Sequence, residues 1–89
     1  MNTLLIDLLE FLRATRRSGH VEYSRVHERG RITLCKGNIV RAVLDQISGE
    51  EAIKRLLVSG PGEVWFVEKD IPDTPPIIEW SRIVSNYLA

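Results

Sequence analysis

The side chains able to do chemistry in this sequence are few, and their spacing matches no common reacting set. Cys35 is the only cysteine, and a nucleophilic or redox role would need a neighbouring base and an electropositive setting. We expect Cys35 to be a small packing residue on a strand instead. His20 and His27 lie on either side of an expected turn and lack the spacing of metal ligands on one element. The sequence therefore predicts no metal site.

The acidic residues and the glycines give no catalytic or phosphate-binding pattern either. Asp7, Asp45, Asp70 and Asp73 form no pair suited to acid–base catalysis, and caps, turns and loops account for them. The run Gly60-Pro61-Gly62 leads into a strand pattern, so its amides are not gathered at a helix N-terminus. We expect the protein not to be an enzyme, with no catalytic residue and no cofactor.

Composition indicates one globular domain spanning residues 1–89. Hydrophobic residues make up 44% and charged residues 27%, which argues against disorder. Twelve Lys and Arg balance twelve Asp and Glu, whereas nucleic-acid-binding domains usually carry a basic excess. A lone cysteine fits a reducing, cytoplasmic location. The run Leu4-Leu5-Ile6 is interrupted by acidic residues too soon for a signal peptide or a membrane insertion.

Alternating polar and apolar residues predict a small antiparallel sheet. Three alternating runs between residues 19 and 44 are separated by glycine-containing turns, which is typical of a three-stranded meander. Its second face, with His20 and Thr33, is expected to be solvated or half-covered. A fourth strand is expected at residues 63–68, where apolar residues point both ways, so we expect both of its faces to be covered.

Three helices complete the prediction. The first runs from about Leu4 to Thr15, capped by Thr3. The second follows Ser48, which forms a capping-box pattern with Glu51. After the proline-rich linker 69–76, a third is expected at 77–88. The apolar face expected of the first helix comprises Leu4, Leu5, Leu8, Phe11 and Leu12.

The predicted fold is therefore α+β, with a mainly antiparallel sheet of about four strands packed on two helices and a C-terminal helix, in the order α-β-β-β-α-β-α. The last helix is apolar around most of its girth, so it must be buried on more than one side. A second copy of the chain or another protein could supply part of that cover.

Large apolar residues in the C-terminal third are the candidates for binding a protein partner, because Trp and Tyr bury much area with few rotors. In the alternative arrangement, the last helix folds onto the outer face of the fourth strand and Trp80 meets Trp65. The candidate residues are Trp65, Val67, Ile77, Trp80, Val84 and Tyr87.

An arginine cluster at the end of the first helix is a second candidate site. Arg13, Arg16 and Arg17 could bind a phosphate or an acidic partner, and they underlie an alternative function as a small nucleic-acid-binding regulator. The plainer interpretation is a solvated helix end whose cations complement the helix dipole.

The order of these motifs resembles the PATAN domain, a bacterial module long filed as a domain of unknown function. The opening has a hydroxyl residue, a leucine and the core Asp7-Leu8-Leu9, and glycines then lead into a strand, a turn, a helix and a final aromatic strand. Lys36 departs from the Asp or Asn that the family often has before the turn glycine. The similar segments are residues 3–12, 18–23, 30–34, 37–42, 49–57 and 62–66.

The resemblance implies a non-enzymatic signalling module that works through protein contacts, with relatives tied to motility and cell differentiation. Family members are commonly joined to receiver or other signalling domains, for which this chain has no room. It would then act in trans or as an adaptor. We therefore expect a cytoplasmic adaptor or regulator of bacterial signalling or motility that binds proteins and self-associates, as a dimer or a larger homo-oligomer.

Overall fold

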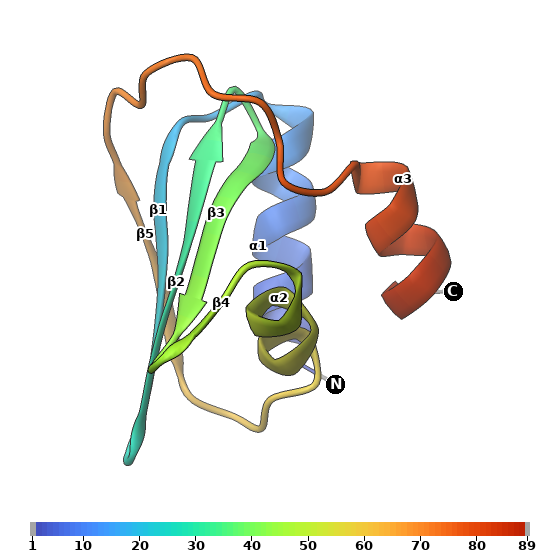
Figure 1. Ribbon diagram of the computed structural model, residues 1–89. Coiled ribbons are helices and arrows are strands. Elements are labelled where there is room, and N and C mark those ends of the chain that lie inside the picture. Colours follow the sequence, from blue (N-terminus) through green and yellow to red (C-terminus); the bar gives the residue numbers. More distant parts are fainter. Residues whose placement is uncertain (1, 89) are drawn as a thin grey trace.

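The alternating residues form one antiparallel sheet in the computed structural model, which describes residues 2–88 (Figure 1). The meander is β1 (Gly19–Arg25), β2 (Glu28–Cys35) and β3 (Asn38–Leu44). The short β4 (Ile47–Ser48) and β5 (Glu63–Glu68) extend it to five strands in the order β4-β3-β2-β1-β5. The α+β class and the antiparallel sheet are confirmed. The additional strand β4 was not predicted, because two residues give no alternation.

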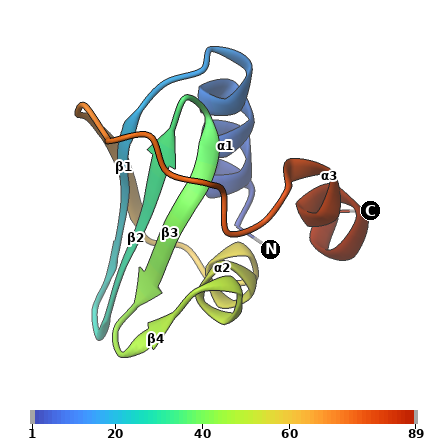
Figure 2. The same cartoon turned by 45° about the horizontal axis from the view of Figure 1, so that its top comes forward.

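Two helices cover one face of this sheet. These are α1 (Thr3–Ala14) and α2 (Glu50–Leu57), and both lie on the same side in Figures 1 and 2. The core forms between this helical layer and the inward side chains of the strands, such as Val21, Ile32 and Ala42. The helices contribute Leu5, Ile6, Leu9, Leu12, Ala52, Ile53, Leu56 and Leu57 to that core.

The start and the buried face of α1 differ from the prediction. Asn2, rather than Thr3, caps the helix, and its Oδ1 accepts a hydrogen bond of 3.1 Å from the backbone N–H of Leu5. The sequence of α1 offers two overlapping apolar stripes, and the sheet buries the one around Leu5 and Leu9. Leu5 and Leu12 are buried and Leu8 is partly buried, as predicted, whereas Leu4 and Phe11 are exposed. The buried face is therefore rotated toward Ile6 and Leu9 relative to the predicted one.

The predicted capping box of α2 is also wrong. Ser48 lies in β4, opposite Val43, and this backbone pairing takes Ser48 out of the cap position. Gly49 takes the N-cap position with φ 76°, and no side chain caps the helix there. Glu51 instead pairs with Arg55 one turn later, at 3.0 Å.

The C-terminal segment is less helical than predicted. Residues 69–79 have no regular structure, and the backbone N–H of Ile77 bonds to the carbonyl of Ile39 at 2.9 Å. That bond ties the segment to the start of β3, so helix begins only at α3 (Trp80–Ile83), followed by the π-helical turn η1 (Val84–Leu88). Within residues 2–88, no helix is long and apolar enough to cross a membrane.

The position of α3 excludes the predicted contact between the two tryptophans. It lies beyond the helical layer, on the side away from the sheet (Figures 1 and 2), where Ile78 and Ile83 are buried. Trp65 projects from the opposite face of the sheet. The last helix therefore does not cover β5, and the prediction that both faces of β5 are covered is wrong.

Candidate protein-interaction surface

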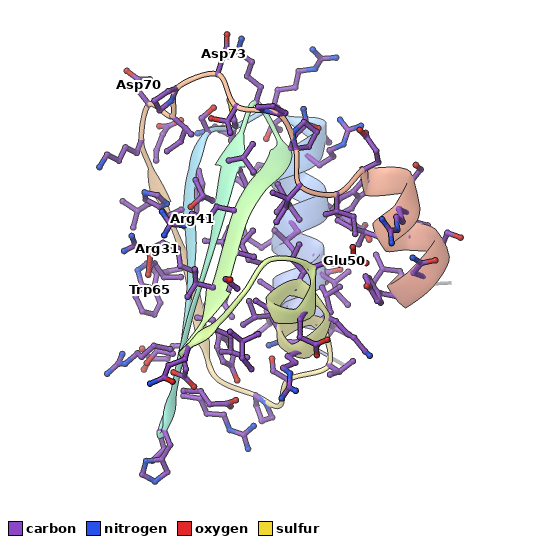
Figure 3. All side chains as sticks on the ribbon, in the orientation of Figure 1. Arg31, Arg41, Glu50, Trp65, Asp70 and Asp73 are labelled. Carbon is purple, nitrogen blue, oxygen red and sulfur yellow. The ribbon has the colours of Figure 1, made fainter. Side chains whose placement is uncertain are left out.

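No helix in residues 2–88 covers the sheet face turned away from α1 and α2, and only its end at Cys35 lies under the proline-rich segment; we call this face the open face. The strand register places its side chains in two rows that cross four strands. One row runs from Trp65 through Glu22 and Arg31 to Val43. The other runs from Val67 through His20 and Thr33 to Arg41. Figure 3 shows Trp65, Arg31 and Arg41 pointing away from the helices.

The apolar part of the open face lies on β5. Trp65 is 43% exposed and Val67 46% exposed, and both point to the same side because they are two residues apart on a strand. Exposed pairs of this kind at the edge of a polar surface are typical of interaction sites, since aromatic residues anchor many interfaces.

The polar part of the open face is largely paired within itself. The Arg31 guanidinium forms an ion pair with the Glu22 carboxylate, and the backbone pairing of β1 with β2 holds both side chains side by side. His20 Nδ1 and Thr33 Oγ1 share a hydrogen bond of 3.0 Å. Arg41 is exposed and makes no ion pair with any residue from 2 to 88.

The surroundings of His20 favour the neutral form of its imidazole by lowering its pKa. Burial lowers the pKa of the His20 imidazole below 6.5, and the nearby positive charge of Arg31 lowers it further, against the opposing effect of Glu22. The face therefore has its fixed positive charge at the Arg41 end and its apolar side chains at the Trp65 end.

A shallow hollow lies over the middle strands of the open face. Its volume is about 400 Å³. The groups around it offer guanidinium donors and hydrogen-bonding side chains. Two carboxylates, those of Glu22 and Asp45, line it as well, and Glu22 is already paired with Arg31, so a bound carboxylate would be drawn to Arg41. The lining residues are His20, Glu22, Arg29, Gly30, Arg31, Thr33, Arg41, Val43 and Asp45.

The structure divides the predicted partner-binding residues into two groups on opposite sides of the molecule. Trp65 and Val67 lie on the open face, whereas Trp80, Val84 and Tyr87 belong to the C-terminal helical segment beyond the helical layer. Ile77 precedes that segment, where its backbone bonds to Ile39 of β3. Sequence reasoning could not separate them, because both groups are simply apolar and late in the chain.

The C-terminal group is partly engaged within the chain. The Tyr87 hydroxyl donates a hydrogen bond of 2.7 Å to Glu50 Oε2, and this bond raises the pKa of Tyr87. Arg82 contacts the same carboxylate at 3.4 Å. Trp80 is half-buried against the core, while Ile77 and Val84 are exposed.

The arginine cluster is less available than its sequence indicates. Arg17 forms an ion pair of 3.1 Å with Glu68 at the end of β5. Arg13 is half-buried, and its Nε is buried without a hydrogen-bond partner among the described residues. Of these three arginines, Arg16, at φ 53°, is the one that is exposed and makes no ion pair with residues 2–88.

Cys35 is buried beneath the proline-rich segment. Its Sγ lies 3.8 Å from the carbonyl oxygen of Ile71 and 3.9 Å from Asp73 Oδ1. Lys36 forms an ion pair with the same aspartate at 3.1 Å. Across residues 2–88, no three His, Cys, Asp or Glu side chains are grouped so that they could hold a metal ion.

Two surface features were missed by the sequence reasoning. A single arginine on a strand gives no sequence pattern, so Arg41 is not predictable as a site residue, yet the register places it in line with Val67. Leu4 and Phe11 belong to the predicted apolar face of the first helix, whereas both are exposed on α1.

Comparison with known proteins adds no identity, since no family model, curated protein or solved structure matches the chain.

Proposed function

We propose that the protein is a non-catalytic protein–protein interaction module and that its partner binds on the open face. The observation that carries this proposal is the exposure of Trp65 and Val67, side by side on a sheet face that carries no helix in residues 2–88. A soluble monomer gains nothing from leaving a tryptophan half in water, whereas an interface gains a large anchor with few rotors.

The arrangement of charge defines the chemistry of the partner. Arg31 and Glu22 neutralise one another, so the uncompensated charge in the two rows is that of Arg41. We propose that the partner presents apolar side chains to Trp65 and Val67, and a carboxylate to Arg41. Charge complementarity of this kind selects the partner and fixes its orientation more than it adds affinity.

The cellular role is proposed from the resemblance to the PATAN domain. On that basis the protein is a cytoplasmic adaptor or regulator in bacterial signal transduction or motility, and it self-associates. The α-β-β-β…α-β-α element order supports this proposal, because the segments that carry the resemblance span most of α1 and β1, all of α2 and the first part of β5.

The proposal is tested by affinity capture from a lysate of the source organism, read by quantitative mass spectrometry. The bait carrying Trp65→Lys and Val67→Lys should lose the specific partner that the wild-type bait retains. Val26→Lys is the matched control, because Val26 is 87% exposed at the β1–β2 turn, away from the open face. Equal capture by all three baits would refute the open face as the binding site.

The alternative function, nucleic-acid binding through the arginine cluster, has weaker support. One of its three arginines is engaged by Glu68, and the chain has no net positive charge. Phosphate binding would weaken steeply as salt rises. A mobility shift with DNA or RNA at low salt that is lost on Arg16→Glu would favour this alternative.

A further inference from the structure

The strand β5 is an edge strand whose middle lacks the usual protection. At the other end of the sheet, β4 is only two residues long, which is one of the ways that proteins prevent edge-to-edge pairing. By contrast, β5 has six residues, and its middle, Val64-Trp65-Phe66-Val67, contains no proline and no charge. Figure 1 shows no helix beside its free edge, and residues 69–76 run away from it over the top of the sheet.

The backbone groups that face this free edge follow from the pairing with β1. The N–H of Lys69 donates to the carbonyl of Ser18 at 3.1 Å, and the register continues with Gly19 opposite Glu68. In an antiparallel pair, alternate residues exchange hydrogen bonds, so the odd-numbered residues of β5 bond to β1. The N–H and C=O groups of Val64, Phe66 and Glu68 therefore point outward.

We propose that a second copy of this chain pairs with the free edge of β5, in antiparallel orientation, with Phe66 opposite Phe66 of the second copy. This inference rests on the self-association in the proposed function and names the surface that makes it. Phe66 would exchange backbone hydrogen bonds with its counterpart, and Val64 would exchange them with Glu68 of the second copy. Every outward-facing group of the strand would then be paired.

Side-chain chemistry favours this register over its neighbours. On the open face it places Trp65 opposite Val67 of the second copy, and Glu63 opposite Lys69 of the second copy. These are an aromatic–aliphatic pair and an opposite-charge pair, both of which stabilise antiparallel strands. The register centred on Trp65 would place Glu63 opposite Val67 and lose the charge pair. A shift by one residue is excluded, because it would turn core-facing side chains to the open face.

The resulting dimer is closed and symmetric. The two-fold axis would pass through the sheet between the two Phe66 residues, so the same surface is used by both copies. The two five-stranded sheets would become one continuous sheet, with both helical layers on one side. Trp65 and Val67 of both copies would form a single apolar strip at the centre of the joined open faces, which leaves that strip available to another protein.

The direct test is sedimentation equilibrium of the full chain, up to several hundred micromolar. Glu68→Pro removes an N–H that points to the free edge while leaving the bonds to β1 in place, and Glu68→Ala is the matched control for loss of the side chain. We expect a concentration-dependent dimer for the wild type and for Glu68→Ala, and a dimer dissociation constant raised roughly tenfold or more for Glu68→Pro.

The outcomes separate this inference from the proposed function. A wild type that stays monomeric throughout the concentration range overturns the inference, while partner capture through Trp65 and Val67 remains a separate result. A folded Glu68→Pro variant that dimerises like Glu68→Ala also overturns the inference. That result would show that the chain self-associates through another surface.

Disulfide trapping tests the register and does not depend on the folding of the proline variant. In a Cys35→Ser background, chains carrying Glu63→Cys are mixed with chains carrying Lys69→Cys and oxidised. The proposed register brings these positions into a non-hydrogen-bonded pair, with Cα atoms about 4.5 Å apart, within disulfide reach. We expect covalent dimers in the mixture only, because either variant alone places its cysteines roughly 20 Å apart. No enrichment in the mixture would overturn the proposed pairing.

Discussion

Replacing Ile83 by alanine tests whether the C-terminal segment is part of the monomer's core. Ile83 is 1% exposed at the end of α3, although the sequence suggested that part of this helix awaits an external partner. Ile83→Ala deletes three buried carbons, which cost about 2.4 kcal/mol at ~0.8 kcal/mol each. A residual cavity would add about 1 kcal/mol.

The measurement is the free energy of unfolding from urea titrations followed by circular dichroism, supported by thermal melts. We expect a loss of about 2.5–3.5 kcal/mol, which in a domain of this size lowers Tm by roughly 10–25 °C. Val84→Ala is the matched control, because Val84 is 41% exposed and its truncation should cost less than about 0.5 kcal/mol.

Two results would refute this reasoning. If Ile83→Ala and Val84→Ala were equally mild, the segment would not be docked on the helical layer in solution. If Val84→Ala cost more than Ile83→Ala, the segment would bury the side that carries Val84, which the structure shows exposed.

Three further predictions follow from the interior of the fold and from the titration of the open face. Gly19→Ala should destabilise the protein by about 1–3 kcal/mol in urea unfolding, because a Cβ there would overlap the carbonyl oxygen of Val67 and Gly19 has φ 152°. His20 has a lowered pKa in the folded state, so the unfolded chain binds its proton first and stability should fall as the pH drops below about 6.5. His20→Asn should flatten that part of the stability–pH curve, and an unchanged curve would refute the assignment. Tyr87→Phe should lower the free energy of unfolding by about 0.5–1.5 kcal/mol, because it removes the hydrogen bond to Glu50, and a neutral effect would contradict a formed bond.

The alternation of side chains made the sheet predictable. Strand residues such as Val21 and Ile32 repeat with a period of two, and glycine-containing turns separate the strands, so the meander and the fourth long strand could be placed from local pattern alone. The short β4 could not, because its backbone pairing with Val43 and Leu44 depends on how the chain leaves β3.

The candidate site was less predictable because it depends on which side of the sheet each element covers. The exposure of Trp65 follows from the crossing of residues 69–79 to the helix side of the sheet, where Ile77 bonds to Ile39. No local sequence pattern indicates on which side of the sheet these residues run. The same limit explains α1, where two stripes are nearly equally apolar and only the sheet decides that Leu5 is buried and Leu4 is exposed.

Site-specific photo-crosslinking tests the central claim, that protein partners bind the open face, most directly. A photoreactive residue would replace, one at a time, Val67 on the open face, Val84 on the C-terminal segment and Val26 at the β1–β2 turn, all three of which are exposed. After irradiation in the source organism's lysate, we predict crosslinks to a protein other than a second copy from position 67 alone. Crosslinks to such a protein from position 84 or 26, with none from position 67, would contradict the account.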